Sequence, residues 1–94
     1  MKERRVTFRD LATDRIFDVN GQTAKALIAL VAAGERGCTA LEVASWALRF
    51  AHYVLCLRRL GLQIDMGREL HPGGWHGRYW LRSGVEILET WRFE

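Results

Sequence analysis

Net positive charge is concentrated between residues 49 and 83 of this 94-residue chain, where arginine carries it, and the arginine side chain is well suited to binding phosphate. Residues 49–83 hold six arginines and two acidic residues, a net charge of +4, whereas the whole chain carries +3. A guanidinium group forms paired hydrogen bonds with a phosphate group or with the edge of a guanine base. The cluster therefore indicates a surface that binds nucleic acid, with an ordinary solvated surface as the alternative.

The histidines and cysteines do not form a catalytic or metal-binding pattern of known spacing. A metal site would have to combine His71 and His76 with His52 and Cys56, whose spacing is wider than that of structural zinc ligands. A nucleophilic pair of His52 with Cys38 or Cys56 is the other option, and chance proximity is the simpler explanation. We therefore expect no enzymatic activity, no metal and no cofactor.

Length and composition predict a single domain over residues 1–94. The chain is 49% hydrophobic and 27% charged, a balance typical of a globular protein. Its longest strongly apolar stretch, residues 26–33, is far shorter than the roughly 20 residues that span a bilayer. The first residues do not resemble a secretory signal, and two cysteines form no disulfide framework. We expect a reduced, cytoplasmic protein that does not contact membranes.

Two helices are predicted ahead of the arginine-rich segment. Residues 23–33 are rich in alanine and leucine, and Gly34 follows them at the position of a left-handed helix cap. Thr39 and Glu42 have the spacing of a capping box, in which each side chain binds the backbone N–H of the other residue. That motif predicts a short second helix over residues 40–46.

A third helix is predicted over residues 49–60, ending at Gly61, and its two sides differ in character. One side is apolar and faces the core, and it consists of Phe50, Val54 and Leu57. The opposite side is polar and basic, and it consists of Arg49, His52, Tyr53, Cys56 and Arg59. The core does not need this second side, so it is available for binding.

Strands are predicted at both ends of the helical region. Short runs within residues 4–19 predict an N-terminal β-hairpin. Alternating apolar residues over 62–66, a glycine-rich loop over 71–77 and a return strand over 78–82 predict a second hairpin. Residues 84–91 are expected to form a short C-terminal helix.

This order of elements resembles the winged helix-turn-helix family of DNA-binding domains over about residues 20–83. Residues 39–61, followed by the loop sequence HPGGWHGRY from His71 to Tyr79, are similar to small stand-alone winged-helix proteins of bacterial and prophage genomes. Family members often carry glycine between the second and third helices, where this chain has Ala47 and Leu48. The resemblance implies an α+β fold with a three-helix core and a C-terminal β-hairpin wing.

The resemblance also implies that the third helix enters the major groove while the wing lies on the backbone or in the minor groove. On the third helix it assigns DNA contacts to Arg49, His52, Tyr53 and Arg59. In the wing the residues expected to contact DNA are Trp75, His76 and Arg78, where an exposed tryptophan beside arginine suits stacking or insertion. The alternatives are a solvated helix face and a Trp75 side chain folded back onto the sheet.

We therefore predict a duplex-DNA-binding protein, either a small transcriptional regulator or an architectural factor of phage type. The alternative function is a winged-helix protein–protein interaction module, favoured by the apolar flank from Leu48 to Leu55. A small chain has difficulty burying four tryptophans, so we also expect a homodimer through the N-terminal hairpin or residues 84–91. The large aromatic residues expected in the core or an interface are Phe17, Trp46, Trp80 and Trp91.

Overall fold

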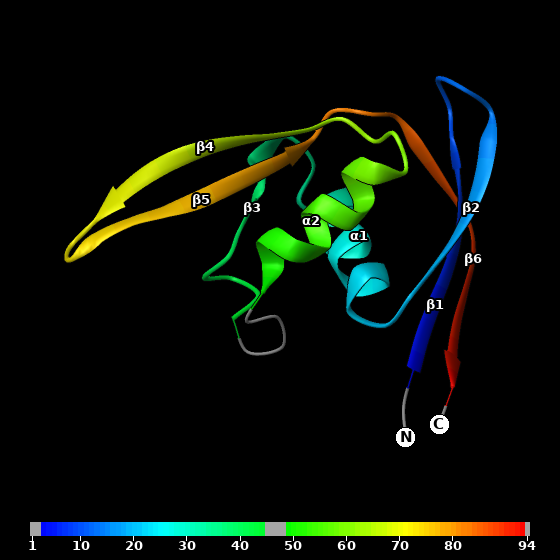
Figure 1. Cartoon of the computed structure of the whole chain (residues 1–94), viewed down its shortest axis with the longest axis horizontal. Coiled ribbons are helices and arrows are strands. Elements are labelled where there is room, and N and C mark those ends of the chain that lie inside the picture. The colour runs from blue at the N-terminus through cyan, green and yellow to red at the C-terminus, as the bar shows by residue number, and fades with distance from the viewer. Residues whose placement is uncertain (1–2, 45–48, 94) are drawn as a thin grey trace.

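The computed structural model describes residues 3–44 and 49–93, which form two three-stranded antiparallel sheets and two α-helices (Figure 1). Helix α1 contacts both sheets and packs against α2. The first sheet has the strand order β2-β1-β6 and the second β3-β5-β4. In chain order the elements are β1 (Glu3–Asp10), β2 (Arg15–Asn20), α1 (Gly21–Ala33), a 3₁₀ turn (Gly34–Arg36), β3 (Cys38–Thr39), α2 (Phe50–Arg59), β4 (Ile64–His71), β5 (Gly74–Leu81) and β6 (Val85–Phe93).

The predicted N-terminal hairpin is confirmed as the pairing of β1 with β2. Asp14 adopts a positive φ of 62° in the connecting turn, a conformation that aspartate tolerates better than most residues. Val6 and Phe8 of β1 and Val19 of β2 point inward and are buried. This hairpin therefore contributes directly to the core around α1.

The predicted C-terminal helix over 84–91 is wrong, because residues Val85–Phe93 form strand β6 and pair with β1. Val85 and Ile87 are β-branched and pack against the core with period two, while Glu86 between them is exposed. Pairing with a strand more than 70 positions earlier in the chain outweighs the weak helical pattern. The first and last strands therefore lie side by side in one sheet (Figure 1).

The predicted second helix is also absent from the part of the chain that the structure describes. The capping box does form, since the Glu42 N–H donates to Oγ1 of Thr39 at 3.1 Å and the Thr39 N–H donates to the Glu42 carboxylate at 3.4 Å. Residues 40–44 make a turn rather than a helix, in keeping with the high cost of nucleating so short a helix. Residues 45–48, which include Trp46 and the Ala47–Leu48 turn, lie outside the described residues.

Helix α2 matches the predicted third helix closely. Phe50, Val54 and Leu57 are buried, as their spacing predicts, and Phe50 makes an edge-on ring contact with Tyr79 of β5 at 5.3 Å. With α1 these residues join the single cluster of buried side chains that also includes Val6 and Phe8. The structure thus has an α+β core built on two described helices and two sheets, not on three helices.

Strands β4 and β5 form a hairpin, called the wing below, that projects away from the helices (Figure 1). Its strands are longer than predicted, because pairing continues to His71 opposite Gly74 and only Pro72 and Gly73 remain in the turn. Gly73 has a φ of 93°, which a residue with a side chain rarely adopts. The wing is not C-terminal, because β6 follows it.

Neither helix within residues 3–44 and 49–93 is long and apolar enough to cross a bilayer.

Candidate nucleic-acid interface

The outward side of α2 carries the polar residues that the sequence predicted there. Arg49, His52 and Arg59 are exposed, and Tyr53 is partly buried. The His52 and Tyr53 rings meet edge-on at 5.6 Å, and Nε2 of His52 lies 3.8 Å from Sγ of Cys56. The helix therefore presents cations and an imidazole on one side, and the phenol ring of Tyr53 packs against the core at the edge of that side.

Several arginines of the two sheets are neutralised by nearby carboxylates. Arg5 lies 3.5 Å from Asp18, Arg9 lies 3.7 Å from Glu86, and Arg82 donates from Nε to Asp65 at 2.8 Å. Such pairing leaves these cations little excess charge for a partner.

The arginines of α2 differ from those of the sheets. Among the residues that the structure describes, no carboxylate lies within ion-pair distance of Arg49 or Arg59. Arg58 donates through Nε and Nη2 to the backbone carbonyl of Ile64, which ties α2 to the start of β4 without neutralising the charge. Arg49 and Arg59 therefore keep the positive charge that Arg5, Arg9 and Arg82 share with carboxylates.

Alternation along the wing gives it two distinct faces. The first, called the loop-side face, packs against residues 35–42 and consists of Glu69, His76, Arg78 and Trp80. The second, called the helix-side face, points toward α2 and consists of Met66, Arg68, Leu70, Trp75 and Tyr79. The three predicted wing residues are thus divided, with Trp75 on one face and His76 and Arg78 on the other.

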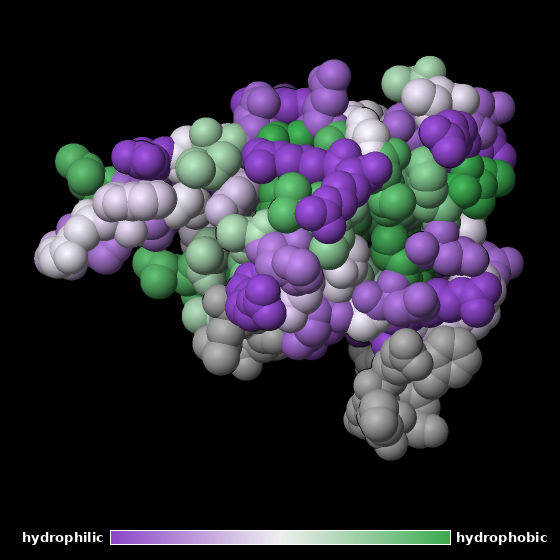
Figure 2. All heavy atoms as spheres, viewed as in Figure 1, coloured by the Kyte–Doolittle hydropathy of each residue, from purple (hydrophilic) through white to green (hydrophobic). Residues whose placement is uncertain are grey.

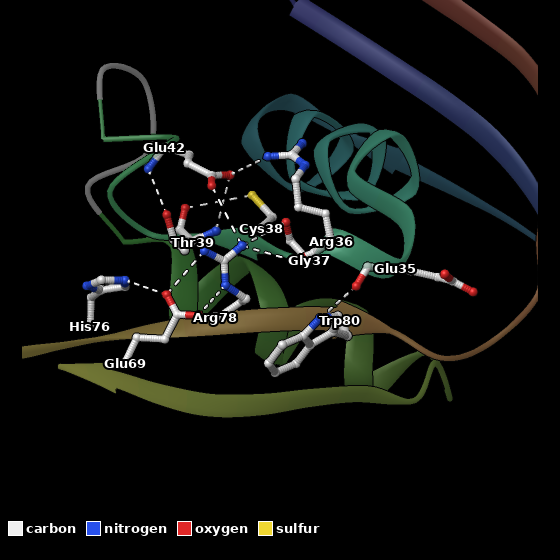
Figure 3. Close-up of polar contacts among 10 residues, drawn as sticks. All are labelled: Glu35, Arg36, Gly37, Cys38, Thr39, Glu42, Glu69, His76, Arg78 and Trp80. Atoms are coloured by element: carbon white, nitrogen blue, oxygen red, sulfur yellow. Dashed lines mark hydrogen bonds and ion pairs between the residues drawn. The ribbon is translucent and has the colours of Figure 1, made fainter.

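Arg78 is the centre of the loop-side face (Figure 3). Its guanidinium donates to the carboxylate of Glu69 through Nε at 2.5 Å and Nη2 at 3.1 Å, and through Nη1 to the carbonyl of Arg36 at 2.9 Å. The Glu42 carboxylate lies 3.8 Å from Nη1, and the Arg78 side chain is only 20% exposed. Arg78 therefore joins β4, β5 and the turn after α1, and it has little capacity left for DNA.

His76 is likewise held within the loop-side face. Its Nε2 lies 2.9 Å from Oε1 of Glu69. Hydrogen bonds from Arg78, and after them the bond with His76, hold the pKa of Glu69 below its ordinary value, and the contact with Glu69 raises the pKa of Arg78. The carboxylate is thereby kept charged and shared between two residues of β5.

Trp80 completes the loop-side face and shows why Gly37 has no side chain. The Trp80 indole donates from Nε1 to the carbonyl of Glu35 at 3.1 Å (Figure 3). A Cβ atom on Gly37 would lie 2.7 Å from that nitrogen, and Gly37 has a φ of 75°. The predicted core role of Trp80 is therefore an anchoring role at the edge of the core.

The helix-side face is left open toward the end of the wing. Leu70 is 89% exposed and Trp75, its partner across the strands, is 50% exposed. The Arg68 guanidinium lies 4.5 Å from the centre of the Trp75 ring. Figure 2 shows hydrophobic and hydrophilic atoms side by side at this end of the molecule. Trp75 is exposed as predicted and does not fold back onto the core.

Leu70 was not among the predicted contact residues, and Arg68 was counted only as part of the arginine-rich segment. The signal was present, because Met66, Arg68 and Leu70 continue the period-two alternation of the strand up to the turn. Placing the loop at residues 71–77 instead of 72–73 concealed the pairing of Leu70 with Trp75.

The other aromatic and cysteine residues have structural surroundings. Phe17 packs on Phe8 at 5.5 Å, and the Arg5 guanidinium lies 4.5 Å from the centre of the Trp91 ring. Burial, and after it the charge of Glu42, raises the pKa of the Cys38 thiol and keeps it protonated. Among the described residues there is no group of three or more His, Cys, Asp or Glu side chains that could hold a metal ion.

Comparisons with curated proteins and with solved structures give no match. The model of one protein family, described as a winged helix domain, matches residues 16–91. That range includes both helices, the wing and most of β6, so β6 belongs to the matched unit. The chain therefore belongs to the winged helix domain family.

Proposed function

We propose that this winged helix domain binds duplex DNA with the outward side of α2 against the DNA. The observation that carries the proposal is the contrast among arginines: Arg49 and Arg59 have no carboxylate partner within the described residues, whereas Arg5, Arg9 and Arg82 each have one. Unpaired cations gathered on one helix raise the local positive potential where phosphate would lie.

In this proposal the residues of α2 have different roles. Arg49 and Arg59, at the two ends of the helix, bind phosphate groups or guanine edges. His52 and Tyr53 lie between them and supply hydrogen bonds and apolar contact to bases in the major groove. The helix thus provides both affinity and sequence preference.

In the wing we assign DNA contact to Trp75 and a positioning role to His76 and Arg78. The support is the division of the wing into two faces: Trp75 is half exposed, whereas both other side chains are bound to Glu69. Arg78 and His76 then act by holding the wing at its angle to α2. The sequence alone predicted that Trp75, His76 and Arg78 all contact DNA, and the proposal keeps only Trp75 in that role.

The test is fluorescence anisotropy of a labelled duplex of mixed sequence, titrated with the protein at several salt concentrations. We expect log K to fall linearly with log salt, and Arg49→Ala or Arg59→Ala to weaken binding several-fold and to reduce the salt slope by about 1. Arg82→Ala is the matched control, since it removes an exposed arginine that Asp65 already neutralises. Equal losses in all three variants, or no binding at low salt, would contradict the proposal.

We propose further that the domain acts in the cytoplasm as a small transcriptional regulator or an architectural factor, of bacterial or prophage type, and does so as a homodimer. Support for the dimer is that the outer edge of β6 pairs with no other strand among the described residues, so two copies could join their sheets there. A two-fold dimer also suits two-fold DNA sites. A monomeric mass by analytical ultracentrifugation at tens of micromolar would exclude the dimer.

The second candidate function is a protein–protein interaction module, and one observation favours it. Leu55 on α2 and Met66 on the wing are 41% and 44% exposed, and Leu70, further along the wing, is 89% exposed. Apolar side chains on an open surface suit a protein partner. Failure to bind duplex DNA at low salt, together with capture of a protein that Leu55→Asp abolishes, would make this the leading function.

A further inference from the structure

We propose that the end of the wing is an apolar wedge, in which Leu70 and Trp75 enter the minor groove, unstack a base step and bend the duplex. This inference rests on the DNA binding proposed above. It adds a second activity, deformation of DNA, and assigns it to residues outside α2.

The first support is the position of the two side chains. Leu70 pairs across the strands with Trp75, one step before the His71–Gly74 pair and the Pro72–Gly73 turn that closes the wing. Both therefore lie on one face at the free end of a two-stranded ribbon. A narrow ribbon ending in apolar side chains has the form that insertion between bases requires.

The second support is that neither side chain belongs to the core or packs against it. The same face of the wing contributes to the core near the body of the domain, where Tyr79 meets Phe50 of α2. On the same face, the Met66–Tyr79 pair is followed toward the turn by Arg68–Gly77 and then by Leu70–Trp75. There Leu70 is 89% exposed. Keeping a leucine in water at a turn is unfavourable, and removing it from water on binding is favourable.

The third support is charge, which favours DNA over a protein as the occupant. Arg68 stacks on Trp75 and, within the described part of the chain, has no carboxylate partner. It therefore supplies an unneutralised cation at the base of the wedge, where a phosphate group would lie. Glu69, the nearest carboxylate along the strand, points to the other face and is already bound by Arg78 and His76.

These observations combine into one geometry. The alternation that directs Tyr79 toward α2 also directs Leu70 and Trp75 to the α2 side of the wing. The wedge and the outward arginines of α2 can then act on the same duplex, the helix in the major groove and the wing in the adjacent minor groove. Leucine is among the residue types that act as wedges and kink the duplex toward the major groove.

The experiment measures bending and unstacking separately from affinity. A duplex labelled at its two ends with a fluorescence-transfer pair reports the end-to-end distance, and a 2-aminopurine base within it reports unstacking. At saturating wild-type protein we expect transfer and 2-aminopurine emission both to rise. Leu70→Gln should lose at least half of both signals and bind several-fold more weakly with an unchanged salt slope, whereas Leu70→Met should keep the signals.

Two control variants separate the wedge from general effects. Ile16→Ala, which shortens an exposed isoleucine on β2 in the other sheet, should behave as wild type. Arg59→Ala should bind more weakly with a smaller salt slope, yet bend the DNA fully once saturated. A thermal melt of each variant checks the fold, which Leu70→Gln should not change because Leu70 contributes almost nothing to the core.

The outcomes distinguish failure of the wedge from failure of DNA binding. If wild-type protein binds with the expected salt dependence but leaves the duplex straight, the wedge is overturned and the proposed function stands. The wedge is also overturned if Leu70→Gln bends DNA as wild type does. A variant that changes only the sedimentation of the free protein would likewise overturn it and would assign the end of the wing to a protein contact. If wild-type protein binds no duplex at low salt, both proposals fail.

Discussion

The two faces of the wing are built from the same two strands but serve different purposes. On the loop-side face every large polar side chain is bound: Arg78 and His76 to Glu69, and Trp80 to the carbonyl of Glu35. On the helix-side face Leu70 and Trp75 are open to solvent. One face thus fixes the wing to the domain, which leaves the other free to bind.

The wing also holds two arginines with different uses at neighbouring positions of its paired strands. Arg78 joins Glu69 to the turn after α1, whereas Arg68 contacts only the ring of Trp75 among the described residues. The two residues carry the same charge, but Arg78 is a structural cation and Arg68 is available to a ligand. The orientation of each side chain, set by strand alternation, decides which it is.

The most damaging change to the loop-side face should be Gly37→Ala. The new Cβ atom would collide with the Trp80 indole, and alanine would be strained at a φ of 75°. We expect a loss of about 2–4 kcal/mol in the free energy of unfolding, measured by urea denaturation. Gly84→Ala is the matched control, because its Cβ would meet Leu11 at an ordinary 3.4 Å. Equal stability of the two variants would show that Trp80 does not anchor the wing.

The next largest effect should come from replacing each of the two wing arginines, Arg78 and Arg68, with alanine. Arg78→Ala should lower Tm by several degrees, because Glu69 loses its main partner and the turn carbonyls lose a donor. Arg68→Ala should leave the free energy of unfolding within about 0.5 kcal/mol of wild type but weaken DNA binding several-fold. Thermal melts give the Tm of each variant, and anisotropy titrations give its affinity for DNA. The account fails if Arg68→Ala is the less stable protein and Arg78→Ala melts as wild type does.

The smallest effect is a dependence of stability on pH. Because Arg78 and His76 hold the pKa of Glu69 below its ordinary value, folding favours the charged carboxylate. The resulting stabilisation is fully present above the ordinary glutamate pKa, about 4.3, and is lost as pH falls through the lower folded-state pKa. The free energy of unfolding is measured by urea denaturation from about pH 6 down to about pH 3, a range that includes the ordinary glutamate pKa. It should fall less steeply for Glu69→Gln than for wild type. Parallel declines would mean that the contact is too weak to matter.

Local patterns predicted the parts of the fold that depend on neighbours in sequence. The period of Phe50, Val54 and Leu57 located α2, and Gly34 marked the end of α1. The capping box of Thr39 and Glu42 formed its hydrogen bonds as predicted, but these bonds only close a turn. A cap satisfies a helix end without providing the length that a helix needs.

Strands whose formation depends on a partner far away in the sequence could not be predicted from the local pattern. Residues Val85–Phe93 become a strand because β1 lies beside them, and nothing in residues 84–91 alone specifies that partner. The same reason explains the wing, where the register decides that Trp75 faces the α2 side and Arg78 the loop side. The outward residues of α2 were predictable because one helix period determines them.

The most direct test of the central claim is a two-dimensional amide NMR titration of ¹⁵N-labelled protein with a short duplex. The account predicts shift changes in α2 around Arg49, His52 and Arg59, and in the wing around Leu70 and Trp75. It predicts little change in β1 and β2. Changes confined to the β2-β1-β6 sheet, or none at low salt, would contradict it and direct attention to a protein partner.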